Sequence, residues 1–188
     1  MKIMNKGIIF ANPPARVREG QQRRGMFPLP LVALANSLDE KIKVEQVSPD
    51  LLADYSSATT LISSSDSNWL AITCYQETMK SVVELAKIAK KLGKKVVLGG
   101  HHITIWGGRQ VLKEIPEADF VVVGEGEIPL GLLITNKNPQ QIPGLWWRED
   151  GKPKTNGLPL YFNDWTNQSS MIRGYSVFDY SVLWERNG

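Results

Sequence analysis

The amino-acid sequence predicts an α/β fold in which helices cover both faces of a doubly wound parallel sheet. The first observation is that its short runs of Val, Ile and Leu are apolar throughout, as in strands buried on both faces. The second is that helix-like segments separate these runs. The third is a composition of 42% hydrophobic and 22% charged residues over 188 positions, which is typical of a globular protein.

The first part of the chain contains three predicted strands and two predicted helices. Strands are expected at residues 7–11, 42–47 and 69–75, where β-branched and apolar residues cluster. The first strand ends abruptly at the letters NPP, because proline stops regular structure. Helices are expected at 27–41, from the spacing of its leucines, and more weakly at 49–65.

The clearest helix of the sequence follows, and two further strands come after it. Residues 79–93 carry a single apolar stripe and end at a glycine, which is a common stop for a helix. Strands are predicted at 95–100 and 119–127, with a short helix between them at 107–115. One or two helical turns are expected at 128–136.

These elements predict five parallel strands in the flavodoxin-like order 2-1-3-4-5, with helices on both faces. Beyond residue 136 the pattern changes, and alternating residues around Asp150-Gly151 predict a β-hairpin. The remaining residues carry aromatic side chains without clean periodicity and are expected to form an extended tail. We therefore divide the chain into a Rossmann-like domain at 1–140 and a hairpin and linker at 141–188.

Composition excludes several classes of protein. A net charge of +3 is too small by itself to indicate nucleic-acid binding, and no apolar run is long enough to span a membrane. The first residues lack the apolar core of a signal peptide, so we expect a cytoplasmic protein. A single cysteine, Cys74, excludes an internal disulfide and an all-cysteine metal or iron–sulfur site.

Ligands of open α/β sheets bind at the carboxyl ends of the strands. Those ends carry the letters NPPAR, TCYQET, GGHHIT and GEGE, with glycines at Gly99, Gly100, Gly124 and Gly126. Glycines at such a position let a flat or elongated ligand approach the backbone closely. The alternative is that they form only turns, with the two glutamates of GEGE exposed to solvent.

Other candidate residues favour structural roles. Adjacent histidines at His101 and His102 would point in opposite directions on an extended segment, which does not favour a shared metal. No base is evident beside Cys74, so a buried inert thiol is favoured over a nucleophile. The basic loop at 16–24 either holds a ligand phosphate or is solvated, and the sequence leaves both open.

Six strings occur in an order and spacing that resemble the amino-terminal cobalamin-binding domain of cobalamin-dependent radical S-adenosylmethionine enzymes. They are GIIFANPP, PLPLVALANSL, WLAITCYQET, VVLGGHHIT, ADFVVVGEGE and IPGLWWREDGKPKTN. The resemblance covers roughly residues 6–156, and the pair LGGHH and ADFVVVGEGE is its most specific part. It implies a corrin ring over the carboxyl edge of the sheet and a nucleotide tail beside the strand ends.

By this resemblance, Asn12 and Pro13 border the corrin ring, Thr73 contacts the tail, and the glycines at 99 and 100 clear its path. We expect a valine at Gly100 to block the cofactor and leave the fold intact. No catalytic residue or protein metal ligand is predicted. The predicted cofactor-binding residues are Asn12, Pro13, Thr73, Tyr75, Gln76, Gly99, Gly100, His101, Gly124, Glu125, Gly126 and Glu127.

The chain departs in two ways from the patterns of these proteins, once from the wider cobalamin-binding group and once from the radical S-adenosylmethionine family. The Asp-x-His-x-x-Gly motif, whose histidine ligates cobalt, does not occur after the first strand. Any metal bound here would be the cobalt of cobalamin. The cobalamin would be in the His-off state, with water or Gln76 below the cobalt. The Cys-x-x-x-Cys-x-x-Cys motif also does not occur, so this chain holds no iron–sulfur cluster and cannot generate a radical alone.

The resemblance implies a cobalamin-binding domain or accessory protein of a radical S-adenosylmethionine system that carries out methyl transfer or related radical chemistry. Its partner is the catalytic domain or protein, towards which 141–188 would lead; neither nucleic acid nor membrane is expected. The alternative is a cobalamin-free recognition domain for an enzyme acting on a peptide or small molecule, with exposed aromatics at Trp146, Trp147, Trp165 and Trp184. A flavin-binding relative is disfavoured, because the prolines after the first strand donate no N–H to a phosphate.

Overall fold

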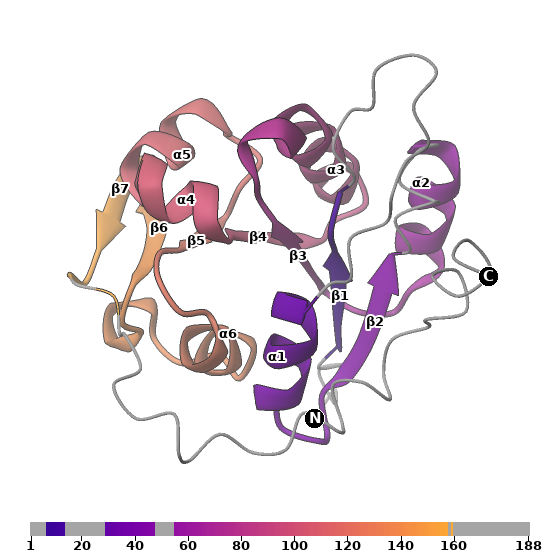
Figure 1. Ribbon diagram of the computed structural model, residues 1–188, viewed down its shortest axis with the longest axis horizontal. Helices are drawn as coiled ribbons and strands as arrows, with labels where there is room; N and C mark the ends of the chain where they lie inside the picture. The colour runs from indigo at the N-terminus through magenta and orange to yellow at the C-terminus, as the bar shows by residue number, and fades with distance from the viewer. Residues whose placement is uncertain (1–6, 14–28, 48–54, 158, 160–188) are drawn as a thin grey trace.

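Seven strands form one sheet in the order β2-β1-β3-β4-β5-β6-β7 (Figure 1). The structure is a computed structural model that describes residues 7–13, 29–47, 55–157 and 159. The strands are β1 (Gly7–Ala11), β2 (Lys43–Val47), β3 (Trp69–Thr73), β4 (Lys95–Gly99), β5 (Phe120–Val122), β6 (Leu145–Glu149) and β7 (Lys152–Thr155). Strands β1 to β5 pair with one another in parallel, and β6 pairs antiparallel with both β5 and β7.

Helices cover both faces of this sheet, as predicted (Figure 1). One core cluster joins α1 and α6 to the face that carries Ala71, Val97 and Val122. The other joins α2, α3, α4 and α5 to the opposite face. The helices are α1 (Leu29–Ser37), α2 (Tyr55–Ser64), α3 (Met79–Lys91), α4 (His101–Trp106), α5 (Gly108–Glu114) and α6 (Glu127–Ile134), with short 3-10 turns η2 (Gln76–Thr78) and η3 (Pro139–Gln141).

The prediction of a five-stranded sheet is wrong, because the C-terminal hairpin extends the sheet to seven strands. Strand β6 pairs with β5, with Val121 opposite Trp146. The hairpin turns at Asp150 and Gly151, which both have positive φ, as the Asp-Gly signal predicted. An unpaired edge at β5 would leave backbone N–H and C=O groups without partners, and β6 satisfies them.

The two tryptophans of β6 fill opposite faces of the sheet, because neighbouring side chains of a strand alternate. Trp146 packs against the cluster that includes α5, and Trp147 is buried in the cluster of α1 and α6. The expectation that these two residues are exposed interface aromatics is therefore wrong. Arg148 donates hydrogen bonds to the carbonyl groups of Leu112 and Ile115, which ties the hairpin to the end of α5.

The segment after β4 is helical, which corrects the expectation of an extended pair of histidines. Gly100 has a φ of 107°, and this turns the chain from β4 directly into α4. The Thr104 N–H then donates to the Gly100 carbonyl group at 3.1 Å. His102 stacks on Trp106 four residues later, with ring centroids 5.4 Å apart. His101 and His102 are therefore consecutive residues of one helical turn.

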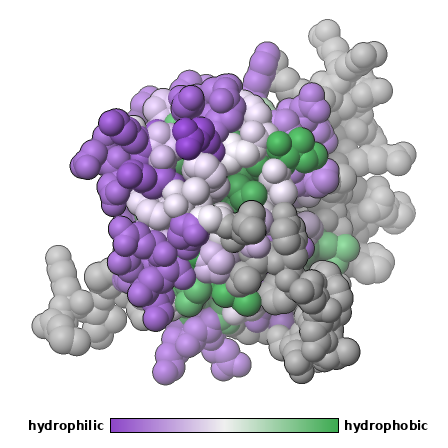
Figure 2. All heavy atoms as spheres, turned by 90° about the vertical axis from the view of Figure 1, so that its left-hand side faces the viewer, coloured by the Kyte–Doolittle hydropathy of each residue, from purple (hydrophilic) through white to green (hydrophobic). Residues whose placement is uncertain are grey.

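The outer edge of the hairpin carries charge rather than apolar surface. Strand β7 reads Lys-Pro-Lys-Thr, and lysine and proline at an edge strand oppose further strand pairing. Figure 2 faces the side on which β6, β7 and α5 lie in Figure 1, and its coloured surface is mostly hydrophilic or neutral with separate hydrophobic patches. No helix within the described part of the chain is long and apolar enough to cross a membrane.

Some predicted features lie outside the described residues. They include the basic loop at 16–24 and the tail aromatics Trp165 and Trp184. The structure shows that the hairpin shares a sheet with the preceding strands. The division of the chain at residue 140 remains a prediction.

The contact between α5 and the hairpin generates a stability prediction. A Cβ atom at Gly108 would lie 2.3 Å from the Trp146 ring, so Gly108→Ala should destabilise the fold by about 1–3 kcal/mol through overpacking. Adding Trp146→Leu should recover part of that loss, because it removes the clash. Urea unfolding of the two single variants and the double variant measures this coupling.

Gly131→Ala is the matched control, because Gly131 is also helical and its Cβ atom would lie 3.8 Å from Leu38. This change should be neutral or stabilising by up to about 1 kcal/mol. Equal destabilisation by both alanines, with no recovery in the double variant, would show that the hairpin does not pack on α5 in solution.

Candidate functional site

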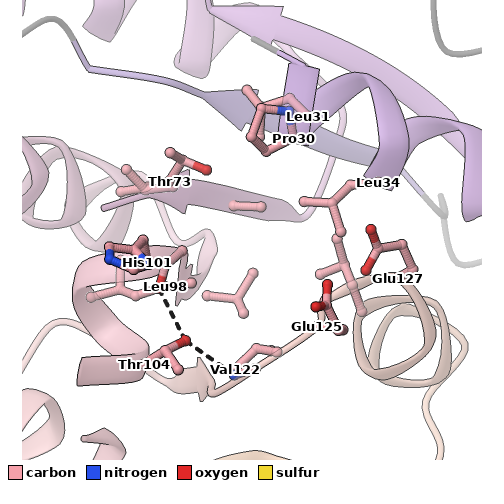
Figure 3. Close-up of a pocket in the computed structure, with 18 residues that line it drawn as sticks. Pro30, Leu31, Leu34, Thr73, Leu98, His101, Thr104, Val122, Glu125 and Glu127 are labelled. Carbon is pink, nitrogen blue, oxygen red and sulfur yellow. Dashed lines mark hydrogen bonds between the residues drawn. The ribbon is translucent and has the colours of Figure 1, made fainter. Parts of the chain in front are cut away.

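A cavity of about 340 Å³ opens at the carboxyl ends of β3, β4 and β5 (Figure 3). It lies between the sheet and the layer formed by α1 and α6, at the edge of the sheet where α/β proteins bind ligands. The lining residues are Pro30, Leu31, Leu34, Ala71, Ile72, Thr73, Val97, Leu98, Gly99, Gly100, His101, Thr104, Val122, Gly124, Glu125, Gly126, Glu127 and Leu130.

The two walls of the cavity are apolar. Ala71, Val97 and Val122 belong to the sheet face that packs towards α1 and α6. Leu34 of α1 and Leu130 of α6 form the opposite wall. Such a cavity favours a flat, largely apolar group, with orientation set by a few polar atoms at its margin.

Gly99 widens the cavity without being required by the backbone. It follows Val97 by two residues, so a side chain here would project from the same sheet face. Its φ is not in the left-handed region, and a Cβ atom would lie no closer than 3.8 Å to Val122. The protein itself therefore tolerates a side chain at this position, and the absence of one leaves room in the cavity.

Gly100 is required by the backbone, which corrects the expectation that a valine there leaves the fold intact. Its φ of 107° and ψ of 178° belong to a region that is essentially restricted to glycine. A Cβ atom would also lie 3.1 Å from both the nitrogen and the carbonyl oxygen of Cys74. Those Cys74 atoms are held by hydrogen bonds to the Gly99 carbonyl and from the His102 N–H, so they cannot easily move.

Thr104 joins the two glycine-rich strand ends across the floor of the cavity. Its hydroxyl group donates to the Gly100 carbonyl at 3.3 Å and accepts from the Gly124 N–H at 3.1 Å (Figure 3). The loop after β5 is thereby tied to α4, which holds the Glu125 and Glu127 side chains at the cavity. This threonine is not among the site residues predicted from the sequence.

Two carboxyl groups, Glu125 and Glu127, lie on the α6 side of the cavity (Figure 3). The Oε2 atom of Glu127 is buried and has no hydrogen-bond partner among the residues that the structure describes. Burial raises the pKa of Glu127, and the negative charge of Glu125 adds to this effect, although the backbone N–H groups of Gly126 and Glu127 oppose it.

The predicted cofactor-binding residues fall into two groups. The first lines the cavity and comprises Thr73, Gly99, Gly100, His101, Gly124, Glu125, Gly126 and Glu127. The second, Asn12, Pro13, Tyr75 and Gln76, does not line it and follows the neighbouring strands β1 and β3. Within the second group Asn12 is buried, and no described residue forms a hydrogen bond with its Oδ1 atom, whereas Gln76 is exposed.

The apolar walls were not predicted from the sequence, because their residues match the pattern of an ordinary core. One usable signal was present: Ala71 is a small residue in the middle of a strand of bulky ones. The lining residues that were not predicted are Pro30, Leu31, Leu34, Ala71, Ile72, Val97, Leu98, Thr104, Val122 and Leu130.

Cys74 is fully buried beneath this site, in agreement with the predicted inert thiol. Burial raises the pKa of the Cys74 thiol, and a protonated thiol is a poor nucleophile. Among the residues that the structure describes, no group of three or more His, Cys, Asp or Glu could hold a metal ion.

Comparison with known proteins relates this site to a family. The B12 binding domain family matches residues 25–134, which include β2 to β5 and all six helices. The radical S-adenosylmethionine methyltransferase TsrM from Kitasatospora setae, solved with cobalamin and a [4Fe-4S] cluster bound, is 15% identical with a TM-score of 0.67. The cobalamin-dependent radical enzyme OxsB, solved with aqua-cobalamin and S-adenosylmethionine, is 16% identical with a TM-score of 0.64.

These similarities cover most of this chain but a minor part of the larger enzymes. The TsrM match spans 88% of this chain and 31% of TsrM, and the OxsB match spans 84% and 22%. No curated protein matches the sequence. The family match spans more than half of the chain, and the fold agrees with it. The chain therefore belongs to the B12-binding domain family, and it shares its fold with part of the cobalamin-dependent radical S-adenosylmethionine enzymes.

Proposed function

We propose that this chain binds cobalamin and serves a radical S-adenosylmethionine enzyme system. The observation that carries the proposal is the apolar cavity at the carboxyl ends of β3, β4 and β5, within the region that matches the B12-binding family. The nucleotide arm of cobalamin ends in a flat aromatic base, which suits a cavity with apolar walls on two sides. The structures of TsrM and OxsB that share this fold contain cobalamin, which supports the proposal.

The residues at the ends of β1 and β3 suit the corrin ring. The chain leaves β1 in one direction along the sheet and β3 in the other, so these ends form the switch point at which α/β folds bind ligands. The unpartnered Oδ1 atom of Asn12 can accept a hydrogen bond from an amide of the corrin periphery. Pro13, Tyr75 and Gln76 extend this border in the proposed complex.

We propose that cobalamin binds without a histidine ligand from this chain. The loop after β1 begins Asn12-Pro13-Pro14 and contains no histidine or aspartate up to Arg16. Bound cobalamin supplies a cobalt centre that can carry a methyl group. The role of the chain is to hold the cobalamin at the sheet edge and to exclude water from its nucleotide arm.

The radical chemistry belongs to a separate catalytic domain or protein. The single cysteine of the chain is buried, and the three-cysteine motif of an iron–sulfur site does not occur. We propose methyl transfer or a related radical reaction for the combined system, in which this chain is the cofactor-binding part. No described contact favours the cobalamin-free recognition function, so that function becomes one outcome of the binding test.

The first prediction is corrinoid binding. Purified protein mixed with hydroxocobalamin should retain it in stoichiometric amount after desalting, with a changed visible absorption spectrum. Boiled protein is the control for non-specific retention. A wild-type protein that is folded by circular dichroism and retains no hydroxocobalamin or methylcobalamin would contradict the proposal and favour a recognition domain.

The second prediction concerns Gly99. Gly99→Val should weaken cobalamin binding by about tenfold or more, because the side chain enters the cavity. The thermal unfolding midpoint should change little, since the protein leaves room for a Cβ atom there. Spectroscopic titration measures the affinity, and Gly131→Ala, which lies outside the cavity lining, is the matched control. Unchanged affinity in a folded Gly99→Val protein would remove β4 from the binding site.

The third prediction separates Gly100 from its neighbour. Gly100→Ala should destabilise the protein by about 2–3 kcal/mol even without cofactor, because of the backbone conformation and the close approach to Cys74. Urea unfolding of the cofactor-free protein measures this effect. If Gly100→Ala unfolds like the wild type and loses only cofactor binding, then a glycine is needed there to make room for the ligand and not for the backbone conformation.

A further inference from the structure

The Glu127 carboxyl group places a buried oxygen atom without a described hydrogen-bond partner at the cavity. It begins α6 and lies near Leu34 at the apolar wall (Figure 3). Within the described part of the chain its buried Oε2 atom has no hydrogen-bond partner, whereas its backbone carbonyl accepts from the Ser37 hydroxyl at 3.2 Å. A buried polar atom without a partner costs free energy, so such an atom beside a cavity indicates a missing partner.

The surroundings of Glu127 disfavour its charged form. Of the described residues that line the cavity, none is a lysine or arginine, and the titratable ones besides Glu127 are Glu125 and His101. Helix α1 packs on α6 and has no titratable side chain within Leu29–Ser37. Burial raises the pKa of Glu127, and this effect together with the negative charge of Glu125 outweighs the opposing hydrogen bonds from the backbone N–H groups of Glu127 and Gly126.

We propose that Glu127, as a neutral carboxylic acid, donates a hydrogen bond to an acceptor atom of the nucleotide arm of the bound corrinoid. This inference rests on the proposed function, because it places the nucleotide arm in the cavity. The ring nitrogen of an aromatic base can accept a hydrogen bond, and such a base has few groups that can donate one. A protonated carboxyl group can satisfy that acceptor, and a carboxylate cannot.

The ionised form of Glu127 would cost more free energy in the complex than in the free protein. A ligand that fills the cavity removes the water that partly solvates Glu127, and no described cation replaces it. The pKa of Glu127 should therefore be higher in the complex than in the free protein. The affinity for the corrinoid is then greatest at a pH below the pKa that Glu127 has in the free protein. It falls, by at most tenfold per pH unit, as the pH rises towards the pKa that Glu127 has in the complex.

The test compares Glu127→Gln, Glu127→Leu and wild-type protein in titrations with methylcobalamin, whose methyl group does not ionise, across mildly acidic to mildly alkaline buffers. Glutamine keeps a donor and has no proton to lose, so this variant should bind like the wild type in acid, more tightly than it in alkali, and without the pH dependence. Leucine has no donor and should weaken binding about tenfold in acid. Glu84→Leu, on the exposed surface of α3 in the other helix layer, is the control and should match the wild type.

A second ligand shows which part of the corrinoid Glu127 contacts. Cobinamide has the corrin ring without the nucleotide arm, so wild type and Glu127→Leu should bind it equally. An equal loss of affinity for cobinamide and methylcobalamin would overturn the assignment to the arm. If Glu127→Leu does not fold, the pH profile of Glu127→Gln decides the question.

The possible failures are distinguishable. If wild-type protein binds no corrinoid, the proposed function fails and the inference fails with it. If wild type binds but Glu127→Gln keeps the wild-type pH dependence, another group titrates, with His101 and Glu125 as the other titratable residues of the cavity, and the inference about Glu127 is wrong. If Glu127→Gln binds more weakly at every pH, a carboxylate acceptor is needed and the neutral donor is excluded.

Discussion

The structure depends on the burial of a parallel sheet on both faces. Parallel neighbours need crossover connections, and each crossover must lie against one face of the sheet. Here α1 and α6 cover one face, and α2 to α5 cover the other. Strands such as Gly7–Ala11 and Trp69–Thr73 are consequently buried along their whole length, which explains why they contain no alternating polar residues.

The cavity arises where this two-sided burial is incomplete. Near the carboxyl edge, Ala71 and Gly99 place little or no side chain between the sheet and the layer of α1 and α6. The larger neighbours Val97, Val122 and Leu130 form walls instead of filling the space. The site is thus a gap in the core at the end of the sheet, and its apolar character follows from its origin as core surface.

Backbone constraints position the polar margin of that gap. Gly100 turns β4 into α4 against the backbone of Cys74, and this turn brings Thr104 within reach of the loop after β5. That loop carries Glu125 and Glu127 to the other side of the cavity. The two glycines at the end of β4 therefore differ: the backbone conformation requires a glycine at Gly100, whereas at Gly99 the absence of a side chain leaves open space in the cavity.

The order of strands and helices was predictable from the sequence, because hydrophobic periodicity and turn residues act locally. The five parallel strands, the helix at 79–93 and the Asp150-Gly151 turn follow from such signals. The position of the cavity at the glycine-rich strand ends was also predictable, because ligands of α/β sheets bind at the carboxyl edge. The family resemblance agreed with the fold and with the B12-binding domain match.

Other features were decided only by the tertiary structure, because they depend on contacts between distant segments. Pairing of β6 with β5 satisfies an open strand edge, and no local pattern states which edge a hairpin joins. The helical conformation of His101 and His102 depends on the approach of Gly100 to Cys74, residues far apart in the chain. The apolar walls have the sequence pattern of an ordinary core, and only the packing of α1 and α6 on the sheet shows that the space between Leu34 and Val97 is open. A sequence determines which residues are apolar, but a cavity depends on how well their volumes fill the space between layers.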